Sequence, residues 1–184
     1  MMDRRSMIVG MGVVVLSAQA GQAQSGAPFL ASFEQAAKGL NGQNPALYYK
    51  AAFEAFKAGR KDEAVMLFYL GQLRYRTHLS ARPNLPQDGD PALFGSLSVV
   101  VGQPLNEYAF GDMKALNTML LAVMAHDRAN PDAFTPPKDF PAAHRAQRSE
   151  MERFRKQVVA DAGNIRAERK KNGLENRSPS AVVR

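Results

Sequence analysis

Residues 46–79 read ALYYKAAFEAFKAGRKDEAVMLFYLGQLRYRTHL, and they predict two helices joined by a tight turn. The first half repeats apolar residues at the spacing of one helical face: Leu47, Tyr48, Ala51, Ala52, Ala55 and Phe56. Gly59 can adopt the positive φ that ends a helix, and Asp62 and Glu63 then fall in the first turn of the next one, where the helix dipole favours acids. The second half is apolar on nearly every face over residues 64–70, so we expect it at the centre of the fold.

The same hairpin carries small, turn and aromatic residues at fixed spacings: Tyr48, Ala52, Gly59, Ala64, Phe68 and Gly71. This pattern resembles one tetratricopeptide-type repeat, a unit of roughly 34 residues. The resemblance covers about residues 45–78, and no second copy with the same signature follows. No proline closes the unit, because the corresponding position near Arg76 is basic. A generic helical hairpin is the alternative.

The first 23 residues predict a signal peptide. Arg4 and Arg5 precede an apolar run over residues 7–16, and small residues follow with AQA and GQA as candidate cleavage signals. Ten apolar residues are too few to span a bilayer core of about 30 Å as a helix, although an uncleaved anchor is the alternative. The arginine pair partly resembles a twin-arginine signal, so Sec and twin-arginine export both remain open. We expect a bacterial periplasmic or secreted protein with no stable membrane insertion after signal cleavage.

Charge is unevenly distributed along the 184 residues. Residues 138–184 hold twelve basic and six acidic side chains, whereas residues 24–137 hold ten of each. A basic segment on an exported protein favours an acidic protein or peptide partner, or an anionic lipid surface, and we expect no nucleic-acid partner. An ordinary solvated helix face is the alternative reading of this segment.

Helical spacing also extends beyond the hairpin. It predicts further helices over residues 29–40, 92–101, 113–128 and 142–171. Residues 97–101 could form a strand, but no partner strand is visible, and residues 102–111 predict a long irregular connection of the kind that often carries function. We therefore expect an all-α fold: a single helical domain of five or six helices around the repeat-like hairpin (residues 24–173), with a long basic C-terminal helix and a mobile tail over residues 174–184.

Catalytic and cofactor motifs are missing from the sequence. There is no cysteine, no GxSxG, no GxGxxG and no GxxxxGK[ST]. No close pair of histidines occurs among His78, His126 and His144, so we expect no metal site. Glu54 and Glu63 fit solvated helix surfaces, whereas Glu107 lies in the irregular connection and could act as one of two catalytic carboxylates. We expect no cofactor and no catalytic residue.

Aromatic and basic side chains form the strongest candidate binding site. Tyr69, Gln72 and Arg76 share one face of the second central helix. The repeat resemblance implies groove-lining positions on the first helix for Tyr49, Phe53, Phe56 and Lys57. Arginine forks match carboxylates and rings give rigid contact area. With the irregular connection, the expected binding residues are Tyr49, Phe53, Lys57, Tyr69, Gln72, Arg76, Asn106, Glu107 and Tyr108. The alternative is that the rings form the core and the arginines are ordinary helix-end charges.

These observations favour a small exported protein that binds another protein or a peptide and performs no chemistry. A periplasmic immunity protein or enzyme inhibitor is a more specific version of the same hypothesis. A cell-wall enzyme that uses Glu107 with a second acid is the alternative from another class.

Overall fold

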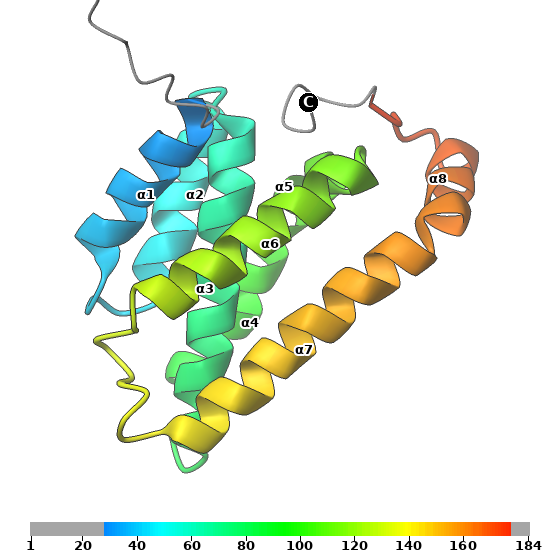
Figure 1. Cartoon of the computed structure of the whole chain (residues 1–184). Coiled ribbons are helices and arrows are strands. Elements are labelled where there is room, and N and C mark those ends of the chain that lie inside the picture. Colours follow the sequence, from blue (N-terminus) through cyan, green and yellow to red (C-terminus); the bar gives the residue numbers. More distant parts are fainter. Residues whose placement is uncertain (1–27, 178–184) are drawn as a thin grey trace, which may run out of the picture.

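The computed structural model describes residues 28–177, and within that range it contains helices and no strand (Figure 1). The helices are α1 (Pro28–Leu40), α2 (Ala46–Lys57), α3 (Lys61–Ala81), α4 (Asp90–Val100), α5 (Gly102–Ala109), α6 (Met113–Ala129), α7 (Pro141–Ala160) and α8 (Ala162–Lys171). The predicted all-α class is confirmed. The predicted number of five or six helices is wrong, because this part of the chain forms eight.

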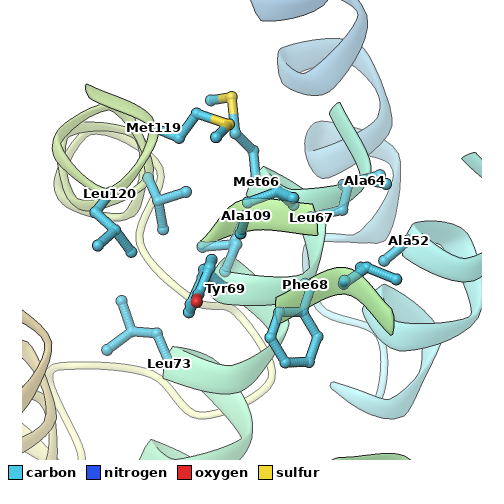
Figure 2. Packing of buried hydrophobic residues seen from close by; sticks show 14 of the residues in the cluster. Ala52, Ala64, Met66, Leu67, Phe68, Tyr69, Leu73, Ala109, Met119 and Leu120 are labelled. Atoms are coloured by element: carbon cyan, nitrogen blue, oxygen red, sulfur yellow. The ribbon is translucent and has the colours of Figure 1, made fainter. Parts of the chain in front are cut away.

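Helix α3 is the centre of the fold, as its apolar sequence predicts. It packs against α1, α2, α5, α6 and α7. Residues 63–71 are all buried, so this helix has no solvent-facing side over more than two turns. Figure 2 shows its side chains between Met119 and Leu120 of α6 on one side and Ala52 of α2 on the other.

The α2–α3 hairpin depends on small residues where the two helices meet. Gly59 ends the turn with a φ of +80°. A Cβ atom on Gly71 would lie 2.6 Å from the Cβ atom of Tyr48, so only glycine fits between the two backbones. Ala52 and Ala64 are fully buried. Close packing of one hairpin is therefore sufficient to explain the spaced small residues.

Residues 102–111 do not form the predicted irregular connection, because most of them fold as helix α5. Pro104 and Gly102 suggest a break in the sequence, but both lie in the first turn, where a missing N–H costs no hydrogen bond. Leu105 and Ala109 are fully buried and hold the helix against the core. A Cβ atom on Gly102 would lie 3.0 Å from the ring of Phe68, which places α5 close to α3.

The predicted long basic C-terminal helix is divided at Asp161 into α7 and α8. Met151 and Val158 of α7 are buried, so this helix docks along the body. Beyond Asp161 the chain bends, and α8 leaves the line of α7 (Figure 1). Ile165 of α8 packs at the edge of the hydrophobic core. A straight continuation would carry this side chain away from the protein, which gives the bend a physical reason.

The segment after α8 is held against the body as far as Arg177. The N–H of Leu174 donates to the carbonyl of Arg169 at 2.9 Å, and the N–H of Arg177 donates to the carbonyl of Gly111 at 2.9 Å. The expected mobile tail therefore does not begin at residue 174. The rest of that tail and the predicted signal peptide, residues 1–23, lie outside the described residues. None of the helices α1–α8 has the length and hydrophobicity needed to cross a bilayer.

Candidate functional site

Two adjoining cavities follow helix α5. The first, of about 380 Å³, lies between α3 and α7 and is lined by Tyr69, Gln72, Leu73, Arg76, Asn106, Phe110, Gln147, Glu150, Met151 and Phe154. The second, of about 730 Å³, lies between α5 and α8 and is lined by Gln103, Asn106, Glu107, Phe110, Asp161, Asn164, Ile165, Glu168, Arg169, Asn172 and Leu174. Asn106 and Phe110 line both cavities, so together they form one depression, which we call the α5 groove.

Aromatic rings form one wall of the α5 groove. The ring centroids of Tyr69 and Phe154 lie 5.8 Å apart, and those of Phe110 and Phe154 lie 6.2 Å apart. The hydroxyl of Tyr69 donates to Oδ1 of Asn106 at 2.9 Å, which leaves the amide nitrogen of Asn106 free to turn toward a ligand. Burial raises the pKa of Tyr69 far above its usual value, so the hydroxyl remains a donor at physiological pH.

Polar side chains border the first cavity. Arg76 is exposed, and its guanidinium carbon lies 5.5 Å from the ring centroid of Phe94. Between residues 28 and 177, no carboxylate pairs with Arg76. Gln72 and Gln147 are half-buried beside it. Rings that supply contact area, amides that can bond a peptide backbone and an unpaired guanidinium suit an extended segment of polypeptide.

The structure places four of the expected binding residues together. Tyr69, Gln72, Arg76 and Asn106 line the first cavity, as their shared helix face predicts for the first three. Glu107 points to the other side of α5 and lines the second cavity. Tyr108 lines neither cavity of the α5 groove. Its hydroxyl donates to Oδ1 of Asp62 at 3.0 Å, and burial together with the charge of Asp62 raises its pKa to about 12.

The first-helix residues implied by the repeat resemblance lie elsewhere. Tyr49 is fully buried, and its ring packs edge-on against the rings of Phe68, Tyr75 and Phe94, so it has no surface to offer a ligand. Phe53 is half-buried, with the ammonium of Lys57 4.9 Å from its ring centroid. Neither Phe53 nor Lys57 lines the α5 groove. For Tyr49 the alternative reading, that the rings form the core, is the one the structure supports.

Several groove residues were not expected from the sequence. Phe154 and Ile165 lie at helical spacing within the predicted C-terminal helix, where an apolar stripe fits docking on the body or pairing with a partner and indicates no cavity. Phe110 is the second-last residue of the expected irregular connection, and only the folding of α5 turns it toward both cavities. Arg169 looks in sequence like an ordinary charge in the last turn of a helix, and no pattern marks it.

A buried ionic network connects α3 and α7, which border the first cavity, through Asp127 of α6. Nε of Arg74 on α3 lies 3.5 Å from Oδ1 of Asp127 on α6, and Nε of Arg148 on α7 donates to Oδ2 of Asp127 at 2.7 Å. This network was not expected from the sequence. A signal exists, because Asp127 falls four residues after the buried Val123 and so occupies the apolar face of its helix.

Each of the three histidines has a hydrogen-bonding neighbour in a different part of the protein. His78 Nε2 lies 3.0 Å from Oδ2 of Asp90, His126 Nδ1 lies 2.6 Å from Oε2 of Glu34, and His144 Nε2 lies 2.7 Å from the carbonyl of Thr135. The contact of His126 with Glu34 joins α6 to α1 across 92 positions of the sequence, whereas the other two contacts join neighbouring elements. No group of three or more potential metal ligands occurs in the described part of the chain.

The pKa values of Asp90 and Asp132 are shifted in opposite directions by their surroundings. Burial acts to raise the pKa of Asp90, but hydrogen bonds from His78 and Tyr75 outweigh it, so the pKa is lowered. Burial raises the pKa of Asp132, and the nearby charge of Arg74 only partly offsets this. Neither carboxylate lines the α5 groove.

No family model, curated protein or solved structure matches this chain. The resemblance to a tetratricopeptide-type repeat therefore rests on the sequence pattern of the α2–α3 hairpin alone.

Proposed function

We propose that this protein is exported and binds an extended segment of another protein, or a peptide, in the α5 groove, without catalysing a reaction. The observation that carries the proposal is the continuity of the two cavities at Asn106 and Phe110. The export part rests on the signal-like sequence of residues 1–23.

The chemistry of the two cavities supports a polypeptide ligand. Side chains of a bound segment would pack against the half-buried Phe110 and Phe154, with the buried ring of Tyr69 behind them, and an acidic residue would pair with Arg76. The second cavity would accept an apolar side chain between Phe110 and Ile165. Because the walls come from α3, α5, α7 and α8, which all pack into one domain, the groove would be largely formed before the ligand arrives.

Site-specific photo-crosslinking tests this proposal in the producing cell. A photoreactive phenylalanine analogue replaces Gln72 inside the groove, and the same analogue replaces Lys50 on the exposed face of α2 as the control. We expect a single protein adduct from position 72 and not from position 50. No adduct from position 72, or the same adducts from both positions, would count against the groove.

Two charge-reversal variants, one in the groove and one outside it, then measure how much the groove contributes to binding of the partner. We expect Arg76→Glu to weaken binding of the captured partner at least tenfold, with Arg145→Glu on the exposed side of α7 as the matched control. Both positions are solvent-exposed, so the melting temperature should stay within a few degrees of the native value. If the partner is an enzyme, its activity with and without this protein tests the immunity or inhibitor version of the proposal.

A catalytic role of Glu107 is the second candidate, and one observation favours it. Glu107, Asp161 and Glu168 all line the 730 Å³ cavity, so a second carboxylate is available for acid–base chemistry on a glycan. Peptidoglycan hydrolysis by the purified protein tests this role, with Glu107→Gln as the variant and Glu54→Gln as the control. A rate that Glu107→Gln abolishes and Glu54→Gln preserves would favour the enzyme over the binding module.

A further inference from the structure

A third cavity, of about 300 Å³, lies where the start of α3, helix α5 and the end of α8 meet residues 174–177. It is lined by Phe56, Lys61, Pro104, Glu107, Tyr108, Arg169, Glu175 and Arg177. Three of these side chains are cations: Lys61, Arg169 and Arg177. We call this cavity the cation pocket.

Arg169 is the most buried of the three cations. It is only 8% exposed, and the one hydrogen bond of its guanidinium within the described chain runs from Nη2 to the carbonyl of Glu175, at 2.6 Å. Its Nε is buried without a partner there, and no carboxylate pairs with the guanidinium. A buried charge without a counter-charge is costly, so the fold maintains an unfavourable arrangement at this point.

Arg177 and Lys61 bring two further charges to the same place. The guanidinium carbon of Arg177 lies 3.6 Å from the ring centroid of Tyr108, and the ammonium of Lys61 lies 5.2 Å from that same centroid. Nε of Arg177 donates to the carbonyl of Tyr108 at 3.2 Å, whereas its Nη2 is buried without a partner in the described residues. Lys61 is also the first residue of α3, where the helix dipole adds positive potential.

The acids near the pocket do not neutralise these cations. Glu107 and Glu175 line the cavity, but both are exposed, and neither forms an ion pair with Lys61, Arg169 or Arg177. Asp62, which follows Lys61, accepts the hydrogen bond of Tyr108. Three cations thus converge on one cavity, and neither guanidinium forms an ion pair with a carboxylate of residues 28–177.

We propose that Lys61, Arg169 and Arg177 form a binding site for an oxyanion, either a carboxylate or a phosphate group. Guanidinium forks match the paired oxygens of both groups, and the ammonium of Lys61 adds a point charge. The bound anion would compensate the buried charge of Arg169. Arg169 also lines the second cavity of the α5 groove, whereas Lys61 and Arg177 line neither of its cavities, so Lys61→Gln tests the anion site separately from the groove.

Titrations of the purified protein with sodium phosphate and with sodium acetate test the site, each against sodium chloride at equal ionic strength. We expect phosphate or acetate to raise the melting temperature with saturation, and to shift the amide NMR signals of residues around Tyr108. Chloride should do neither. Preference for acetate would assign the site to carboxylate ligands, and preference for phosphate to phosphorylated ones.

Variants test whether the anion binds in the cation pocket. We expect Arg169→Gln and Lys61→Gln to weaken anion binding at least tenfold, whereas Arg166→Gln, on the exposed side of α8, should bind like the native protein. Lys61 is exposed, so its substitution tests the site even if Arg169→Gln fails to fold. The proposal is overturned if neither anion gives a saturable change, or if Lys61→Gln binds as tightly as the native protein.

Discussion

Arg74 on α3 and Asp127 on α6 form an ion pair inside the protein. Nε of Arg74 lies 3.5 Å from Oδ1 of Asp127, and each side chain is 1% exposed. The remaining donors of Arg74 bond Tyr48, Asn41 and the carbonyl of Asn130. Moving charges out of water costs several kcal/mol per ion, so this pair persists only because nearly every polar group of Arg74 finds a partner.

Removal of the charge of Asp127 should destabilise the protein strongly. We expect Asp127→Asn to lower the free energy of unfolding by about 3–5 kcal/mol, because Arg74 would lose the carboxylate with which it pairs in the interior. Urea unfolding followed by far-UV circular dichroism measures this loss. Arg148→Gln removes the other partner of Asp127, but that arginine is 30% exposed, so the loss should be smaller. Equal losses of unfolding free energy for Asp127→Asn and Arg148→Gln would contradict this prediction.

Two glycines in different surroundings predict opposite effects of alanine substitution on stability. Gly71 lies in the contact of α2 with α3, and Gly95 lies in open space. Gly71→Ala should destabilise by about 1–3 kcal/mol, because the new Cβ atom would lie 2.6 Å from the Cβ atom of Tyr48. Gly95→Ala in α4 is the control, since no atom lies within 4 Å of its added Cβ. There the better helix propensity of alanine should stabilise by up to about 1 kcal/mol. Thermal unfolding of both variants tests the difference in sign.

The buried carboxyl of Asp132 predicts a pH-dependent difference in stability. Its side chain is 2% exposed, and burial raises its pKa above the value in the unfolded chain. A raised folded-state pKa contributes stability that is fully present below the unfolded pKa of about 4 and is lost as the pH rises through the folded value. Asp132→Asn removes the ionisation, so the variant should gain stability relative to the native protein between acidic and neutral pH.

Urea unfolding at pH 3.5, 5 and 7 measures this trend. Asp139→Asn serves as the control, because it removes an exposed carboxylate from the same loop. A stability difference between Asp132→Asn and the native protein that is constant over this range would contradict the prediction.

Tyr49 and Arg76 were expected to share a binding role, but the structure predicts opposite effects on stability. Tyr49 is fully buried among three rings, so Tyr49→Ala should cost about 3–5 kcal/mol of unfolding free energy. Arg76 is exposed, and Arg76→Ala should change stability by less than about 0.5 kcal/mol. Melting temperatures of the two variants distinguish the core residue from the groove residue. A stable Tyr49→Ala variant would require a different packing of α2 against α3.

Local sequence patterns predicted the helices whose signals lie within a few neighbouring residues. Residues 64–70 are apolar on nearly every face of their helix, and only the centre of the bundle can bury all of these faces. The helix predicted over residues 113–128 follows Asp112, whose Oδ1 accepts hydrogen bonds from the N–H groups of Lys114 and Ala115 at 3.1 and 3.0 Å. The spacing over residues 29–40 likewise matches α1, with Phe33 and Ala37 buried.

Breaks and bends were harder to predict, because packing decides them. Pro104 suggests an irregular connection in any sequence-based reading, but the burial of Leu105 and Ala109 stabilises a helix around it. Helical spacing continues over residues 142–171 and so predicted one helix, although Gly163 lies two residues after the division at Asp161. The docking of Ile165 at the core edge provides the reason only once the body is folded.

The sequence by itself determined the all-α class, the central position of α3 and the shared face of Tyr69, Gln72 and Arg76, because helical periodicity relates residues three or four positions apart. The tertiary structure alone decided which of those residues face a cavity and which side chains join them there. Phe110 and Phe154 meet across two helices, and Lys61 and Arg169 meet across more than a hundred residues. The spacing of residues along the sequence does not predict such long-range neighbours, because they depend on how the whole bundle packs around α3.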